Sequence, residues 1–357
     1  MLMQYTCTLI PKSTNVKVDF YKSILIQKYT FAFVLDISLY CCIIVLLAKV
    51  YLRGVFNMTK VIALSNQKGG VGKSTNNVMF AITVAKLFNK KVLHIDMDLQ
   101  ANSTFMLSLT FDQTTWPASI TKCLDDKDLE EGIVHLTDNL DAIAGDKDFR
   151  NWGTWLADNV KGTHNRTFYF KPLLDKIKDR YDYVFIDTPP ATDIKVDNIM
   201  VATDYVVVVQ ETKRFAFEGS KDLTSSYLQT LYNDFNDEIN IQVAGILLVL
   251  LDKNHSVEQR IVQKTTEYFG KENIFGQIIK NHLRLENYGE YGVQFNDWHD
   301  SRMLALFSDL FQELEERIEQ FEKYGDIKPG YQYEPKYVIN NRLTTLGKKE
   351  LKPNGLD

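Results

Sequence analysis

The sequence predicts an α/β fold in which a mostly parallel, twisted sheet is covered by helices on both faces. Two observations lead to this prediction. From Met58 onward, short apolar runs rich in β-branched residues alternate with longer stretches of helical periodicity. The short runs are almost continuously apolar instead of alternating with polar residues, which is typical of parallel strands that are buried on both faces.

The individual elements follow from these patterns. Apolar runs predict strands at 61–65, 92–96, 183–187, 205–210 and 241–251. Helical patterns predict one helix that begins after Ser74 and others at 171–180, 217–235, 255–269 and 301–321. The repeated order of strand, helix and strand is typical of βαβ units, in which a helix joins two parallel strands.

We expect one main domain over residues 58–321, interrupted at about 109–165 by an irregular insertion with short helices. A total length of 357 residues leaves room for a large core. The tail at 322–357 carries glycines and prolines among charges, without a sustained apolar period. We expect this tail to be extended or disordered.

Residues 1–57 differ from the rest of the chain. The stretch 31–52 is nearly all apolar and long enough to span a bilayer, but Asp36 lies within it. A charge near the middle of a membrane costs about 2.5–3.5 kcal/mol. Because a strand is expected directly after Met58, we expect Met58 to be the true start and the working protein to lack 1–57. A membrane anchor and a packed extension are the alternatives.

Charge and cysteine content narrow the class of protein. The formal net charge of -5 gives no overall attraction to nucleic acid, so DNA binding would need a local basic face. Of the four cysteines, only Cys123 lies beyond residue 58, and the six histidines are scattered. This distribution excludes a disulfide framework and a Cys/His metal site, and it fits a reducing cytoplasm.

A glycine-rich loop lies between the first expected strand and the helix after it. Residues 67–75 read Gln-Lys-Gly-Gly-Val-Gly-Lys-Ser-Thr. Glycines allow backbone N–H groups to converge on phosphate oxygens, and the positive end of the following helix favours an anion. The sequence therefore predicts an ATP site that consists of Lys68, Gly69, Gly70, Val71, Gly72, Lys73, Ser74 and Thr75. Lys73 is expected on the β and γ phosphates and Ser74 on Mg²⁺.

Carboxylates follow two of the other expected strands. Asp96 and Asp98 come at the end of the run 92–96, and Asp187 ends the run 183–187 before Thr188, Pro189 and Pro190. Ligands bind beyond the carboxyl ends of parallel strands. We expect Asp98 to orient the attacking water, and Asp187 to hold Mg²⁺ with Ser74. Asp96 is a further candidate for the magnesium shell.

The loop contains another lysine besides Lys73, and the pattern around it resembles that of a known family. The loop lacks the first glycine of the general G-x-x-x-x-G-K-[ST] pattern, because Gln67 stands there, but Lys68 precedes Gly-Gly-Val-Gly-Lys. This pattern resembles the deviant Walker A loop of the ParA/MinD family of P-loop ATPases. The segment from Asp96 to Thr104 is similar to that family's D-x-D-P-Q-x-N-[AS]-T, with Leu99 in place of proline. The family's later I-P-R-N-x-R-L-x-E segment is matched at 278–286, except that Ile279 replaces its proline.

The resemblance implies a mechanism. In the family, the early lysine reaches the partner's phosphates across an ATP-dependent dimer, which makes Lys68 a catalytic residue beside Lys73 and Asp98. ParA-type dimers bind DNA without sequence preference and release it when a small centromere-binding protein of the ParB type stimulates ATP hydrolysis. The segments in which the family carries its basic face contain Lys253, Arg260, Lys264, Lys280 and Arg284.

We therefore expect a plasmid partition ATPase of the ParA type that hydrolyses ATP slowly and acts in the cytoplasm on the nucleoid. Two alternatives stay open. One is a membrane-positioning ATPase of the MinD type, although 322–357 shows no amphipathic basic helix; membrane attachment would require that 31–52 is expressed. The other is a nucleotide-dependent regulator that does not hydrolyse ATP.

Overall fold

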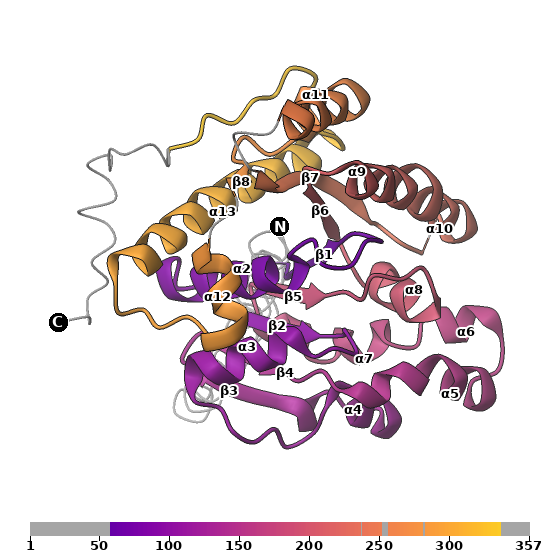
Figure 1. The fold of residues 1–357 in the computed structure, drawn as a ribbon. Helices are drawn as coiled ribbons and strands as arrows, with labels where there is room; N and C mark the ends of the chain where they lie inside the picture. Colours follow the sequence, from indigo (N-terminus) through magenta and orange to yellow (C-terminus); the bar gives the residue numbers. More distant parts are fainter. Residues whose placement is uncertain (1–57, 237, 252–255, 281–282, 337–357) are drawn as a thin grey trace, which may run out of the picture. The chain divides into compact units, whose positions relative to one another are not determined.

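The computed structural model describes residues 58–336 except 237, 252–255 and 281–282 (Figure 1). Within this part of the chain, the strands form one eight-stranded sheet in the order β3-β4-β2-β5-β1-β6-β7-β8. All neighbouring pairs are parallel except β3 with β4. The strands are β1 (Lys60–Ser65), β2 (Val92–Asp96), β3 (Ile133–Thr137), β4 (Leu140–Ile143), β5 (Tyr183–Asp187), β6 (Tyr205–Glu211), β7 (Gln242–Leu251) and β8 (Ile279–Lys280).

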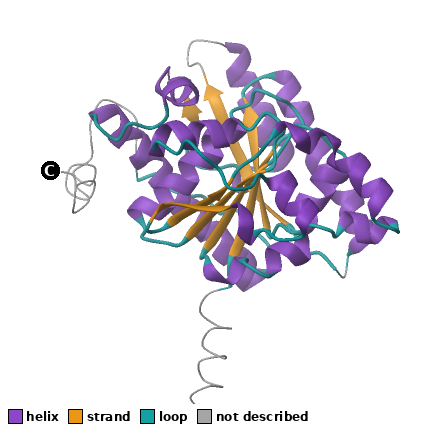
Figure 2. Ribbon diagram, turned by 90° about the horizontal axis from the view of Figure 1, so that it is seen from below, coloured by secondary structure: helices purple, strands orange, loops and turns teal. Residues whose placement is uncertain are grey.

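Helices cover both faces of the sheet (Figure 2). One face carries α2 (Lys73–Leu87), α3 (Asn102–Phe111), α12 (Leu283–Tyr291) and α13 (Trp298–Tyr324). The helices of the other face are α4 (Ile120–Asp126), α5 (Trp152–Asn159), α6 (Thr163–Thr167), α7 (Lys171–Asp175), α8 (Ile194–Val201), α9 (Arg214–Lys221), α10 (Gln229–Phe235) and α11 (Ser256–Phe269). The predicted α/β fold with a mostly parallel sheet is confirmed.

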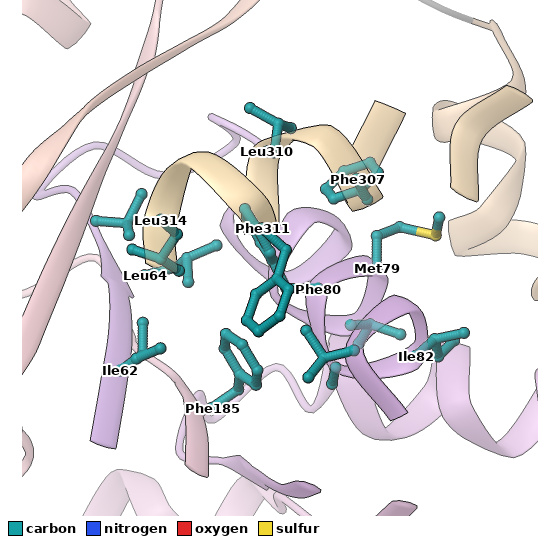
Figure 3. Close-up of a cluster of buried hydrophobic side chains, with 14 of the residues drawn as sticks. Ile62, Leu64, Met79, Phe80, Ile82, Phe185, Phe307, Leu310, Phe311 and Leu314 are labelled. Carbon is teal, nitrogen blue, oxygen red and sulfur yellow. The ribbon is translucent and has the colours of Figure 1, made fainter. Parts of the chain in front are cut away.

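The core between the sheet and α2 and α13 is aromatic. Phe80 of α2 stacks on Phe185 of β5, with ring centroids 6.0 Å apart. The edge of Phe80 also meets Phe307 of α13 at 5.3 Å. Figure 3 shows these rings together with Ile62 and Leu64 of β1. Burial of this cluster fixes β1, β5 and α2 relative to one another, and the predicted phosphate-binding loop connects β1 to α2.

The predicted strands are all present, but the stretch at 109–165 contains more than short helices. Its β4 pairs in parallel with β2, and β3 pairs with β4, so the stretch also forms one edge of the sheet. β4 has four residues and β3 is only partly buried. Runs this short and this polar carry too little periodicity to be distinguished from loop.

Two helical predictions change in detail, and one further strand was not predicted. The helix expected at 171–180 is α7 followed by a separate turn of 3₁₀ helix, Lys178–Arg180. The helix expected at 217–235 begins earlier, at Arg214, and contains a π-helical segment, Asp222–Leu228, between α9 and α10. The two-residue strand β8 had no pattern of its own.

The beginning of the expected tail is packed in the structure. α13 continues to Tyr324, and the chain then returns along this helix. The buried Tyr333 hydroxyl donates a hydrogen bond of 2.7 Å to Asp309 Oδ1 of α13. The prediction of an extended or disordered tail thus does not hold for 322–324, which are helical. Residues 337–357 and the predicted N-terminal segment 1–57, with its apolar stretch 31–52, lie outside the described residues.

Candidate active site

The predicted phosphate-binding loop connects the end of β1 to the start of α2. Gly70 and Gly72 have φ angles of 77° and 82°, in the left-handed region that favours glycine. Gly72 directly precedes the first residue of α2, where the N–H groups of the first helical turn have no partner within the helix. The local sequence therefore forms a glycine-rich turn directly before the N-terminus of a helix, which is the geometry that an anion cradle requires.

Asn66, which the sequence analysis did not single out, attaches this loop to the sheet. Its buried side chain donates hydrogen bonds to the Val209 carbonyl oxygen of β6 at 2.9 Å and to Ser220 Oγ of α9 at 3.1 Å. Its Oδ1 accepts a hydrogen bond of 2.8 Å from the Lys68 N–H. Asn66 thereby fixes the main chain at Lys68.

An open cleft of about 460 Å³ lies next to the loop. Its lining combines the glycines and the first turn of α2 with Asp98, Leu99, Phe105 and Pro190. The Lys73 side chain is buried at the base of this cleft, and its Nζ donates a hydrogen bond of 3.3 Å to the Lys68 carbonyl oxygen. Burial lowers the pKa of Lys73, and the carboxylates of Asp187 and Asp98 act in the opposite direction. An anion in the cleft would stabilise this buried ammonium group further.

Asp96 and Asp187 lie side by side, because β2 and β5 pair in the register that aligns them. Both oxygens of Asp96 are engaged: the carboxylate accepts hydrogen bonds from the Thr104 N–H and hydroxyl at 2.9 and 2.8 Å and from the Asp98 N–H at 3.1 Å. Burial, together with the charge of Asp187, raises the pKa of Asp96 to about 7. These contacts favour a role for Asp96 in holding the turn that carries Asp98, instead of a role as metal ligand.

Asp187 is fully buried, and its two carboxylate oxygens have different surroundings. Its Oδ2 accepts a hydrogen bond of 2.6 Å from Ser103 Oγ, whereas its buried Oδ1 has no hydrogen-bond partner in the described part of the chain. Burial raises the pKa of Asp187 to about 6, against the opposing effects of Ser103, Ser74 and Lys73. A buried carboxylate oxygen without a donor, close to the Ser74 hydroxyl, is a suitable ligand for hydrated Mg²⁺. The residues present therefore fit the magnesium ion that the sequence predicts.

The side chain of Lys68 has a different direction from that of Lys73. Lys68 is not among the residues that line the cleft. Its Nζ lies 3.2 Å from Glu211 Oε2, at the end of β6. Lys213 forms an ion pair with the other oxygen of Glu211. The ion pair of Lys68 with Glu211 could not be predicted from the sequence, since 143 positions separate the two residues.

The basic residues predicted to contact DNA have different surroundings. Arg260 and Lys264 are exposed one turn apart on α11, and Lys280 is half-buried on β8. Arg284 of α12 forms ion pairs with Asp300 at 2.8 Å and with Asp297 at 2.9 Å. A guanidinium group held by two carboxylates has few donors left for a phosphate, which favours a structural role for Arg284. Lys253 lies outside the described residues.

Comparison with known proteins identifies relatives of this chain. Residues 59–241 match the model of a family described as an AAA domain. The chain is 29% identical over 264 residues to the sporulation initiation inhibitor protein Soj of Bacillus subtilis, covering 72% of this chain and 98% of Soj. It is 30% identical over 241 residues to the chromosome-partitioning ATPase Soj of Treponema pallidum, covering 68% of this chain and 90% of that protein.

The fold also has a match among solved structures. A plasmid partition protein from Borrelia burgdorferi bound to AMPPNP superposes with a TM-score of 0.57 at 23% identity, over 74% of this chain and 99% of the other. At this identity the similarity supports the fold alone.

Proposed function

Because the chain belongs to the ParA/MinD family of ATPases, we propose that it is a partition ATPase that binds Mg-ATP, dimerises around the nucleotide and holds DNA without sequence preference. The observation that supports this proposal is that the side chains of two lysines on one loop take different directions. Lys73 lies at the base of the cleft of its own subunit, and the ammonium group of Lys68 lies outside it. A lysine placed in this way can serve the nucleotide of a second copy of the chain.

Within one subunit, the loop and Lys73 bind the phosphates of ATP, and Ser74 with Asp187 holds magnesium, which neutralises charge on the phosphate oxygens. Asp98 lines the same cleft and orients the water for in-line attack. The hydrogen bond from the Gln100 N–H to Asp98 Oδ1, 3.0 Å long, fixes this carboxylate in place.

Between subunits, Lys68 of each copy reaches the phosphates bound by the other. The dimer therefore exists while ATP is bound and separates after hydrolysis. We further propose that a small centromere-binding protein of the ParB type stimulates this slow hydrolysis, and that a plasmid or a similar replicon is the cargo. Arg260 and Lys264 of α11, with Lys280 of β8, form the proposed DNA contacts, and dimerisation doubles their number.

The variants Lys68→Ala and Asp98→Ala test the mechanism. Lys68→Ala should abolish ATP-dependent dimerisation and hydrolysis, because the charge that crosses the interface is lost. Asp98→Ala should retain ATP and accumulate as a DNA-bound dimer, because only the water loses its position. Dimerisation is measured by sedimentation with Mg-ATP, and hydrolysis is measured with DNA and the encoded partner protein present. Lys161→Ala, at an exposed lysine far along the chain from the loop, is the control.

Outcomes of the same assays separate the alternatives. Unchanged hydrolysis in both variants would refute the mechanism. A wild-type protein that binds ATP but does not hydrolyse it with DNA and partner present would be a nucleotide-dependent regulator. Within the described residues, no helix is both long and apolar enough to cross a membrane. Sedimentation of the full chain with liposomes but not with DNA would instead support a membrane-positioning ATPase.

The proposed DNA face has its own test. Replacing Arg260 and Lys264 together by alanine should weaken the binding of a random-sequence duplex. It should also reduce the magnitude of the slope of log affinity against log salt by about 4, because the dimer loses two phosphate contacts in each subunit. The double variant Lys161→Ala with Lys176→Ala removes the same charge from other exposed positions and should keep the wild-type slope. Equal slopes for both double variants would exclude α11 from the DNA interface.

A further inference from the structure

Glu211 is a carboxylate between two lysines at the end of β6. Its Oε2 lies 3.2 Å from Lys68 Nζ, and its Oε1 pairs with Lys213 Nζ. The Glu211 side chain is only 7% exposed, whereas the side chains of Lys68 and Lys213 are 35% and 60% exposed. Glu211 is thus the fixed member of this ion-pair group, and the ammonium groups approach it from the solvent side.

Hydrogen bonds fix the main chain at Lys68, so the part of this residue that can move is its side chain. The Lys68 N–H donates to Asn66 Oδ1, and its carbonyl oxygen accepts from Lys73 Nζ. Asn66 is in turn bonded to β6, the strand that ends in Glu211. The position of Lys68 relative to Glu211 is therefore set by the fold, and the ammonium group can leave Glu211 only by rotation of its own side chain.

Charge determines whether the Lys68 ammonium group pairs with Glu211 or with a phosphate. Burial by itself raises the pKa of Glu211, but the hydrogen bonds from Lys213 and Lys68 outweigh it and the net shift is downward, so the carboxyl group is ionised at neutral pH. A buried carboxylate that loses every partner is strongly disfavoured. If Lys68 turns to a phosphate, Lys213 still pairs with Glu211 and keeps this cost small.

We propose that Glu211 is a positioning residue that holds Lys68 within its own subunit until the phosphates of a second copy compete for the ammonium group, and that Lys213 permits the release. This inference rests on the proposed function, because it assigns Lys68 to the partner's nucleotide. The pair Lys68–Glu211 stabilises the separate subunit and opposes dimerisation. Competition between one carboxylate and the phosphates then sets the ATP-dependent dimer affinity.

Two variants should act in opposite directions. Glu211→Gln removes the competing charge, so the dimer Kd in Mg-AMPPNP should fall about two- to fivefold, as for the loss of a partly exposed ion pair. Lys213→Met leaves Lys68 as the remaining described partner of Glu211, so the dimer Kd should rise by a similar factor. Glu211→Asp keeps the charge and should stay closer to wild type than Glu211→Gln. Glu218→Gln neutralises a carboxylate on α9 that pairs with Lys221 and should leave the dimer Kd unchanged.

Sedimentation equilibrium over a range of protein concentrations measures these Kd values, and denaturant unfolding of each variant checks its fold. An unchanged or weaker dimer of folded Glu211→Gln overturns the inference. If that variant is unfolded, Lys213→Met, at an exposed lysine, decides: a weaker dimer supports the inference and an unchanged or tighter dimer overturns it. Dimerisation that survives Lys68→Ala refutes the proposed function instead. When Lys68→Ala prevents dimerisation but neither Glu211→Gln nor Lys213→Met changes the Kd, the proposed function stands and this inference fails.

Discussion

Asn66 offers the most direct test of how the fold positions the phosphate-binding loop. The change Asn66→Ala removes a side chain that is 1% exposed and forms three short hydrogen bonds of 2.8, 2.9 and 3.1 Å, besides a longer one of 3.5 Å to the Ala216 carbonyl oxygen. Each such bond contributes about 1 kcal/mol net, so the free energy of unfolding should fall by about 3 kcal/mol. Part of this loss is local, because the Lys68 N–H loses its acceptor and the loop is released from β6 and α9. We therefore expect the Kd for Mg-ATP to rise about tenfold, which corresponds to about 1.4 kcal/mol.

Two measurements check this prediction. Urea unfolding gives the change in stability, and calorimetric titration with a slowly hydrolysed ATP analogue gives the change in affinity. Asn159→Ala is the matched control, since this exposed asparagine donates one local hydrogen bond to the Trp155 carbonyl oxygen. The control should lose less than about 0.5 kcal/mol and bind ATP normally. A folded Asn66→Ala protein with wild-type ATP affinity would show that the loop does not depend on this attachment to the sheet.

Three further predictions concern buried polar groups. His94 is buried with no hydrogen-bond partner for either ring nitrogen among the described residues, and burial lowers its pKa from 6.5 to about 3. The unfolded chain therefore takes up a proton that the folded chain does not, so stability falls as pH drops below 6.5, by about 2 kcal/mol at pH 5. In urea unfolding at pH 7 and pH 5, His94→Leu should no longer show this loss of stability. His299→Gln, at an exposed histidine, should still show it. An equal pH dependence of stability in wild type and His94→Leu would contradict the assignment of the effect to His94. Arg317→Met should lower the free energy of unfolding by about 3–5 kcal/mol, because it leaves buried Glu313 without its ion-pair partner. Adding Glu313→Gln to this variant should recover part of the lost stability. If it recovers none, the unpaired charge is not the cause of the destabilisation. Asp187→Asn should raise the Mg²⁺ concentration for half-maximal hydrolysis at least about tenfold without lowering the stability of the nucleotide-free protein. An unchanged Mg²⁺ dependence would show that Asp187 does not bind the metal.

The sequence alone was sufficient to predict most of the strands and helices and the parts of the site that lie within one short segment of the chain. The strands that end in Asp96 and Asp187 were predictable because parallel strands buried on both faces are almost continuously apolar. The loop at 67–75 was predictable because a phosphate cradle needs backbone N–H groups, glycine and a following helix within one short stretch. The edge hairpin of β3 and β4 was not, because its strands are short and partly exposed.

Tertiary structure decided how the predicted residues are used. Lys68 and Lys73 lie five positions apart on one loop, yet one lies against Glu211 and the other at the base of the cleft. Arg284 belonged to a predicted basic face, yet Asp297 and Asp300 hold it. Glu211 and the Asn66 partner Val209 both lie 143 positions from the loop residues that they contact. Local pattern determines where a strand ends and which groups the loop carries. The charge partners of a side chain depend on which distant strands pack beside it, and that is fixed only when the apolar faces of the sheet and helices are buried together.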